Sequence, residues 1–518
     1  MIDAIDAMRA AGTSARRLRR WWKRVLVVAV ALALAWVTFG LWLGSRVRTS
    51  LDPIERMRAL LPQAPESDRA WPAVRATLGP LKGTVDGSTD PDRRANALAA
   101  EWDAEPSADQ DLLYAFLESH AGELSSLRSA LQRPVLGQPL SCDATEEDIA
   151  FHGRTDDGRI DQPSRRTGFA LFDLRLPQLA DFRLTSGLLA ADAVRVAKRG
   201  DGATAVADVD ASLRMGTFCE EQPVLISVLV NAAIRARTQL VVARLMERYP
   251  GAFTDADLER LAAVLEQSPP PDLSRALAGE RLGFEDVIQS MYTDDGNGDG
   301  VMVASPLLGS LVQVSKGNWE EPQHAFGLGS MVCALATPAV AMLAPTRAEL
   351  MAEYDLLISE TLANSTLPQA QWTDEADARI GRRMGGDWRS LDLLGMLAPA
   401  ISTVGRVTQP QADLRQARFA VAMEQARRRL DTDAPMVDEL FADARGLATD
   451  SLTGRPASRS VDRSTGAVRY GVRVSGDGAF GDGSPIVERT RPQGQTGDGV
   501  VGPPVDWLWL ELGPAKGK

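Results

Sequence analysis

The feature that most constrains the fold is an uncharged run of 20 residues near the N-terminus, Val25 to Gly44. At a helical rise of about 1.5 Å per residue, this run covers about 30 Å, the hydrocarbon thickness of a bilayer. It is longer than the apolar region of a cleaved signal peptide, and the residues that follow, 44–48, contain no small-x-small cleavage site. The run therefore predicts an uncleaved, single N-terminal transmembrane helix.

The charges before this run predict its orientation. Residues 1–24 contain seven Lys or Arg side chains, against only Asp3 and Asp6. By the positive-inside rule, this basic tail stays in the cytoplasm and the chain after the span crosses the membrane. We expect a single-pass protein of the inner (cytoplasmic) membrane, with a cytoplasmic N-terminus and its bulk outside the cytoplasm.

The charge of the exported part disfavours nucleic acid as a partner. Residues 1–50 carry nine basic and two acidic side chains, which leaves 48 basic and 67 acidic side chains, a net charge of -19, for the rest of the chain. Such a field repels phosphate backbones. We expect the membrane and an envelope protein as partners, and no nucleic acid.

The residues and motifs of common enzyme sites are scarce in this chain. It has three histidines and lacks the H-E-x-x-H, G-x-S-x-G and Walker A motifs. The segment 152–161 mixes His152 with carboxylates and could bind a metal, although its Gly and charge content is more typical of a solvated loop. Many Asp and Glu residues are present, but their spacing singles out no catalytic pair.

The three cysteines, Cys142, Cys219 and Cys333, allow at most one disulfide within the chain. Cys142 could pair with Cys219 in an oxidising compartment. The alternative is that all three are free thiols that pack as small hydrophobic side chains.

Turn and helix signals divide the rest of the chain. Residues 51–90 are rich in Pro, Gly and Asp, and predict a stalk or connector with one or two short helices. Helical patterns dominate residues 91–365, and Pro, Gly and Asp residues then mark a boundary before a last module at 411–512. The expected fold is mainly α: an irregular helical bundle or short solenoid, followed by a small C-terminal α+β module.

Residues 176–249 give the clearest tertiary signal, three successive helices with short breaks. Gly200-Asp201-Gly202 predicts the turn of an antiparallel hairpin. Pro223 opens the third helix, which is apolar nearly all round from 224 to 230 and should be the central helix of a bundle, with Leu225 and Leu229 in the core.

Two helices should follow this central helix. Thr254 with Asp257 predicts the start of the first, and the three prolines at 269–271 end it. Asp272 then begins a second helix toward Tyr292.

Residues 326–345 are the other candidate for membrane contact, about 20 mostly small and apolar residues by the usual length criterion. Because Pro338 lies in the second half and Gly, Thr and Ala are frequent, insertion as a second span should be marginal. The two interpretations are a buried helix, which we favour, and a second span. Thr346 with Glu349 predicts the start of the next helix.

Asp295-Gly-Asn297-Gly-Asp299-Gly300 has the opening of a calcium-binding loop, with oxygen ligands at alternate positions and Gly at the sharp turn. Pro306 stands where such a loop needs its final Glu, so a complete EF-hand is absent. The remaining alternatives are a weak calcium site completed by a distant carboxylate and an acidic turn held by Asx hydrogen bonds.

The last hundred residues carry a different pattern. A helix over 411–430 is followed by Asp450-x-x-x-Gly454-x-Pro456, then by Tyr470-x-x-x-x-Ser475-Gly-Asp477-Gly and by Gly481-Asp482-Gly483. In order and spacing, residues 411–512 resemble the soluble C-terminal module of type II secretion pseudopilins. The resemblance implies a helix packed on a small antiparallel sheet, with calcium contacts at Asp477 and Asp482 and a weaker third candidate at Asp498.

The whole chain resembles a family of uncharacterised membrane-anchored bacterial proteins, which implies architecture and no activity. We expect a membrane-anchored scaffold or interaction protein of the cell envelope. The alternative is an envelope hydrolase with paired carboxylates, which would need a deep pocket with two carboxyl groups about 5 to 9 Å apart.

Overall fold

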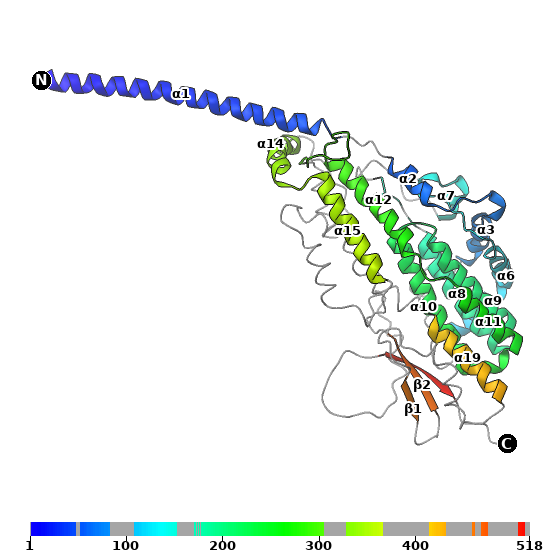
Figure 1. Cartoon of the computed structure of the whole chain (residues 1–518). Helices are drawn as coiled ribbons and strands as arrows, with labels where there is room; N and C mark the ends of the chain where they lie inside the picture. Colours follow the sequence, from blue (N-terminus) through cyan, green and yellow to red (C-terminus); the bar gives the residue numbers. More distant parts are fainter. Residues whose placement is uncertain are drawn as a thin grey trace.

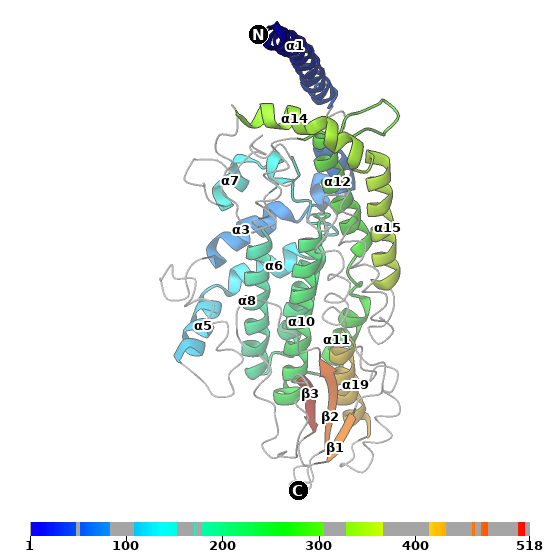
Figure 2. The same cartoon turned by 90° about the vertical axis from the view of Figure 1, so that its left-hand side faces the viewer.

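The computed structural model describes residues 2–47, 52–82, 108–152, 170–171, 174, 176, 178–304, 328–365, 414–430, 458–461, 468–474 and 506–512. Over these residues the protein is mainly helical (Figure 1). A long N-terminal helix, α1 (Ile2–Gly44), leads into an elongated helical domain, and a small sheet lies at the end of the domain opposite to α1 (Figures 1 and 2).

Helix α1 extends away from the domain with its apolar side chains uncovered (Figure 1). Leu26, Val27 and Leu32 are 64%, 68% and 66% exposed. The helix has 43 residues and is therefore about 65 Å long, roughly twice the hydrocarbon thickness. The expected apolar N-terminal helix is present, and its basic first half continues the same helix beyond the apolar stretch.

Three long helices form the centre of the domain: α8 (Gln178–Lys198), α9 (Gly202–Cys219) and α10 (Leu225–Arg248). Each of them contacts the other two, so that they pack as one three-helix unit. The α8–α9 turn is the predicted one: Gly200 has a φ of 88°, and the Asp201 carboxylate accepts a hydrogen bond from the Thr204 amide at 3.0 Å.

Helix α10 is mostly buried, but its first turns are buried on one side only. Leu225 and Val228 are 3% and 1% exposed, whereas Ile226 is 48% exposed. Leu229 is only half-buried at the edge of the core, so its predicted core position is wrong. Leu225 and Val228 share a core cluster with residues of the next long helix, α12 (Leu273–Met291), whereas Ile226 faces solvent.

Further helices pack around this centre. The first two are α11 (Asp255–Gln267) and α12 (Leu273–Met291), and both begin as predicted: Thr254 and Asp257 form a capping box, and Asp272 caps α12. Helix α15 (Arg347–Ser365) packs on α12. A short 3-10 turn, Pro250–Ala252, connects α10 to α11.

Helix α19 (Arg415–Leu430) belongs by its contacts to the helical domain. It packs on α10 and α11. Phe419 and Met423 are buried in the same cluster as Leu245 and Leu261. The helix that opens the predicted C-terminal module is therefore part of the bundle core.

Residues 52–82 pack into the domain, although their sequence predicts a stalk or connector. Two short helices are present, α2 (Pro53–Leu60) and α3 (Trp71–Leu81), with a 3-10 turn at Glu66–Asp68 between them. Helix α3 buries its apolar face against α6 and α8, because Trp71, Val74 and Leu78 recur at helical spacing. The same layer contains α5 (Ala108–Ser119), α6 (Ala121–Ala130), the 3-10 turn Ser141–Asp143 and α7 (Glu146–His152).

Helix α14 (Leu328–Leu343) is not the buried helix that we favoured from the sequence. It lies against α1 and crosses the base of that helix (Figure 2). Leu335, Met342 and Leu343 are 46%, 67% and 52% exposed. Its 16 residues measure about 24 Å, too short to cross about 30 Å of hydrocarbon.

The sheet contains β1 (Ser458–Val461), β2 (Val468–Val474) and β3 (Asp506–Leu512). Its order is β1-β2-β3 and both pairings are antiparallel. Tyr470 on the central strand lies opposite Arg459 and Leu510. Strand β3 contacts α10, which places the sheet against the helical domain.

Candidate functional site

The acidic loop at 294–300 lies where α1 meets the domain. Val47, just after α1, forms an isolated antiparallel bridge with Thr293. The amide of Asp294 donates to the carbonyl oxygen of Arg46 at 3.3 Å. If α1 is a membrane anchor, this loop is at the membrane-proximal end of the domain.

The carboxylates of this loop are bound to backbone amides. Asp295 Oδ1 accepts from the amides of Asn297 and Asp299 at 2.7 and 3.1 Å. Asp299 Oδ1 accepts from Gly300 and from Ala348, in the first turn of α15, at 2.7 and 3.0 Å. These bonds are those of an Asx-stabilised turn that also caps a helix.

The same hydrogen bonds shift the pKa values of both groups. The amides of Asn297 and Asp299 lower the pKa of Asp295. Desolvation raises the pKa of Asp299, but the amides of Ala348 and Gly300 outweigh it, so the pKa is lowered. Both carboxyl groups are therefore held as anions by protein donors.

A calcium site in this loop stays a prediction. Calcium takes six to eight oxygen ligands, and the described part of the chain contains no group of three or more His, Cys, Asp or Glu residues arranged to hold a metal ion. Asn297 is exposed, and one oxygen of each of the two aspartates already accepts amide hydrogen bonds. Asp477, Asp482 and Asp498, the other calcium candidates, lie outside the described residues.

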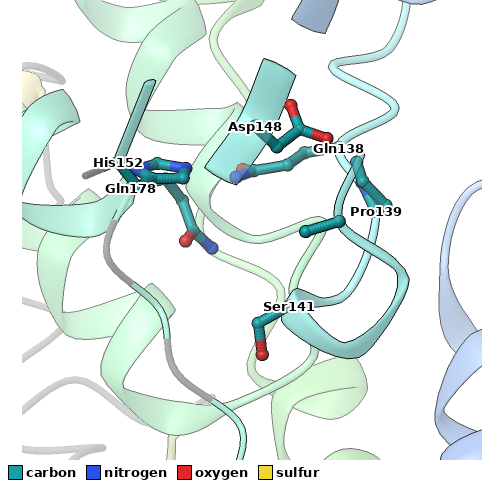
Figure 3. A pocket seen from close by; sticks show the side chains of 7 residues that line it. Gln138, Pro139, Ser141, Asp148, His152 and Gln178 are labelled. Atoms are coloured by element: carbon teal, nitrogen blue, oxygen red, sulfur yellow. The ribbon is translucent and has the colours of Figure 1, made fainter. Parts of the chain in front are cut away.

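A small cavity lies between α7 and the turn before it (Figure 3). Its volume is about 20 Å³, room for about one water molecule. Its walls are formed by Gln138, Pro139, Ser141, Ala144, Asp148, His152 and Gln178. Ser141 and His152 lie on opposite sides of the cavity in Figure 3, so they do not form a nucleophile and base pair.

The charged groups around this cavity have structural partners. Asp148 accepts from the Trp71 indole at 2.7 Å and the Thr145 amide at 2.9 Å, and it pairs with Arg75. Desolvation raises the pKa of Asp148, but these donors outweigh it and lower the pKa overall. His152 stacks on Trp71, and its Nδ1 lies 3.4 Å from Asp181 Oδ2.

Two buried carboxylates, Asp192 on α8 and Asp208 on α9, share one cation. Arg128 binds both, with Nε 2.6 Å from Asp208 Oδ1, and Arg195 binds Asp192 at 2.6 Å. Both aspartates are 1% exposed. Burial, then repulsion from Asp192, raises the pKa of Asp208. The pair is enclosed between helices, where no substrate reaches it.

All three cysteines are free, so the Cys142–Cys219 pairing is not formed. Cys219 is buried beside Phe218 in the α3–α6–α8–α9 core. Cys142 lies in a separate cluster with Met57 and Leu282. The two thiols belong to different layers of the domain, and each packs as a small hydrophobic side chain.

Reasoning from sequence missed two groups of functional interest. One is the buried polar cluster around Arg128, for which the only signal is a charged residue on an otherwise apolar helix face. The other is the contact of α14 with α1, which joins residues about 300 positions apart, such as Trp36 and Leu335. No local pattern could have indicated that contact.

No protein-family profile matches the chain, and no curated protein or solved structure is significantly similar to it. The site must therefore be judged on its own geometry.

Proposed function

We propose that this protein is a single-pass scaffold or interaction protein of the cell envelope, anchored in the inner membrane by α1. The observation that carries the proposal is the exposure of the apolar stretch. Only 6% of the apolar 18-residue window of Trp21–Gly44 is buried, against 61% of the corresponding window of Leu225–Arg248, the other described helix that is long and apolar enough to span a membrane. The second helix is a core helix of the bundle, whereas protein covers the apolar stretch of the first only near its C-terminal end, where α14 packs, and the rest needs lipid.

The basic tail before this stretch supports a cytoplasmic N-terminus and an exported domain. The acidic balance of the exported part supports a protein partner and disfavours nucleic acid. Among the described residues, the paired carboxylates are buried and the cavity near His152 holds about one water. We therefore favour binding over the hydrolase alternative.

We further propose that residues 411–512 form a pseudopilin-like module fused to the bundle. A helix followed by a three-stranded antiparallel sheet supports this proposal. The burial of α19 against α10 and α11 implies that the module would be rigidly attached to the helical domain and would not swing on a linker. Weak calcium binding at Asp477 and Asp482 belongs to the same proposal.

The orientation is tested with a reporter enzyme that works only after export, fused at Lys518. We expect it to be active, and activity of a cytoplasm-only reporter at the same position would overturn the orientation.

The interaction is tested by crosslinking in native membranes and purification of the full chain. A matched control replaces residues 25–44 by an unrelated transmembrane sequence. Recovery of the same protein partner with both chains supports a binding domain, and recovery of no specific partner with either chain overturns the scaffold proposal.

A further inference from the structure

We infer that α14 is a second membrane-contacting element, which lies in the plane of the bilayer in the extracytoplasmic leaflet and docks on the outer end of α1. The inference rests on the proposed anchoring of α1. Its ligand is the lipid of the bilayer that α1 crosses.

The docking contact depends on a glycine. Gly40 is buried, and a Cβ atom at this position would lie 2.0 Å from the carbonyl oxygen of Ala334 and 3.2 Å from Pro338 Cδ. Only glycine lets the two backbones approach so closely, as at other packed helix pairs in membranes. Gly44, one turn later on α1, has nothing within 4 Å of such an atom.

The contact also lies where Pro338 interrupts the backbone hydrogen bonds of α14. Pro338 has no N–H group, so the carbonyl of Ala334 lacks its usual helical donor. That carbonyl faces Gly40, and the indole Nε1 of Trp36 donates to the next carbonyl, that of Leu335, at 2.8 Å. A carbonyl without a donor costs little in water but several kcal/mol in hydrocarbon, so the indole donor that Trp36 supplies in this turn suits a membrane-embedded proline helix.

The rest of α14 suits a lipid surface. Its sequence, LGSMVCALATPAVAML, contains no charge. The hydroxyl of Thr337 is satisfied within the helix, by the Cys333 carbonyl at 2.8 Å. Leu335, Met342 and Leu343 point away from protein cover, with Met342 67% exposed. Like the exposed apolar side chains of α1, these three residues are available to lipid.

The depth of the contact agrees with an in-plane helix. Gly40 and Trp36 lie four and eight residues before the end of the uncharged run, hence about 6 and 12 Å inside the hydrocarbon boundary. Interfacial helices bury their apolar face to a similar depth, about 5–10 Å. Within the last two turns of the run, Phe39 stacks on Trp42 at 5.8 Å, and Arg46, just beyond the run, lies over the Trp42 ring, an arrangement typical of a helix end near the headgroups.

The described residues that flank α14 in the sequence lie near the same end of α1. Thr293 is bridged to Val47 and the amide of Arg347 donates to Gly300, so the described residues on both sides of α14 lie at the outer end of α1. With a length of about 24 Å, α14 cannot cross and return. It lies across the base of α1, as Figure 2 shows.

The test uses the full chain in lipid vesicles, with the native cysteines replaced (Cys142→Ser, Cys219→Ala, Cys333→Ala) and one nitroxide label at a time. Labels at Met342→Cys, Val27→Cys and Ser359→Cys report on α14, the anchor and the exposed side of α15. We expect oxygen to relax the first two labels several-fold more than a water-soluble nickel chelate does, and the reverse at residue 359.

The outcomes separate this inference from the proposed anchor. A water-exposed label at 342 with a lipid-exposed label at 27 overturns the inference and leaves the anchor standing. Water exposure at both positions overturns both. A label at 342 that neither reagent reaches shows that protein covers α14, which also overturns the inference.

A matched pair of variants tests the docking contact itself. Gly40→Leu and Gly44→Leu add the same side chain to the same apolar helix, so neither weakens insertion. We expect Gly40→Leu to displace α14 and to make the nitroxide at 342 several-fold more mobile, whereas Gly44→Leu leaves its spectrum unchanged. Equal spectra in both variants would overturn the Gly40 contact.

Discussion

Arg128 shows how single residues hold the helices of this domain together. Its guanidinium group joins Asp192 on α8 to Asp208 on α9, and all three side chains are largely buried. Such a cluster adds little net stability over apolar packing, but removing one member leaves uncompensated charge in the interior. The cluster therefore specifies which helices meet, and it is sensitive to single substitutions.

We expect Arg128→Met to lower the free energy of unfolding by about 3–5 kcal/mol, because two buried carboxylates lose their shared cation. Adding Asp208→Asn should restore part of the loss. The control is Arg214→Met on α9, whose ion pair with Asp210 is partly exposed, with side-chain exposures of 41% and 21%, and should be worth at most about 1 kcal/mol. Urea unfolding of the three variants measures the differences, and equal losses for Arg128→Met and Arg214→Met would contradict the prediction.

Asp148 should make stability depend on pH. Its pKa is lowered in the folded state, since the donors around it outweigh desolvation. The stabilisation is therefore present above the unfolded pKa, about 3.9, and is lost as the pH falls through the folded value. Asp148→Asn should cost about 1.5–3 kcal/mol at neutral pH, as for other hydrogen bonds to a charged group. In acid its unfolding curve should approach that of the unsubstituted chain, and a gap that widens below about pH 4 would rule out this role.

A substitution of Asp299 distinguishes a role in helix capping from a role in calcium binding. Because Asp299 Oδ1 accepts from Ala348 at the start of α15, Asp299→Ala should cost about 1 kcal/mol, as for loss of an N-cap. We expect the same loss in thermal unfolding with calcium and with chelator. A stabilisation of the unsubstituted chain by calcium that Asp299→Ala abolishes would instead establish a metal site in the loop.

At the scale of elements, the starts and turns of helices were predictable because they depend on neighbouring residues. The capping box of Thr254 and Asp257 and the turn at Gly200 are both formed as the sequence predicts. The buried face of α10 was not predictable, since apolar residues surround its first turns and only the partners decide that Val228 is buried and Ile226 is not. The sequence likewise assigns α3, which follows a Pro-rich segment, to a stalk, because its burial depends on partners that are remote in the sequence.

The candidate site was predictable to a similar extent. The acidic loop was recognisable from its alternating Asp and Asn residues, but whether these bind amides or a metal depends on Ala348, which is remote in sequence. The contact of Gly40 with Ala334 depends likewise on long-range packing. The sequence therefore indicated which local groups could act, and the residues that contact them from remote parts of the chain could not be predicted.

Helix α12 offers a matched pair of glycines that tests helix packing. A Cβ atom at Gly279 would lie 1.6 Å from the carbonyl oxygen of Pro223, at the start of α10, whereas one at Gly283 would meet nothing within 4 Å. Gly279→Ala should therefore cost about 1–3 kcal/mol through overpacking. Gly283→Ala should add up to about 1 kcal/mol of stability from helix propensity alone. Opposite shifts in unfolding temperature are expected, and shifts of the same sign would contradict the α10–α12 contact.

At the scale of the whole molecule, the C-terminal end of α1 is tied to the domain at several points. Val47 bridges Thr293, the Asp294 amide donates to Arg46, and Trp36 donates to Leu335 of α14. A single flexible linker would let the domain turn freely about α1. These contacts instead fix the direction in which the bundle extends from α1, so that the sheet lies at the end of the domain opposite to that helix (Figure 1).

One span plus one in-plane helix predicts a specific behaviour on extraction. The full chain should stay with membranes in both high salt and alkaline carbonate, because neither removes a helix with about 30 Å of apolar length from hydrocarbon. A chain of residues 52–518 retains α14 and should bind vesicles only reversibly, since a partly buried helix face holds far less strongly than a span. Carbonate should release this shorter chain completely. If it stays in the membrane pellet as the full chain does, a second segment spans the bilayer and the single-pass architecture is wrong.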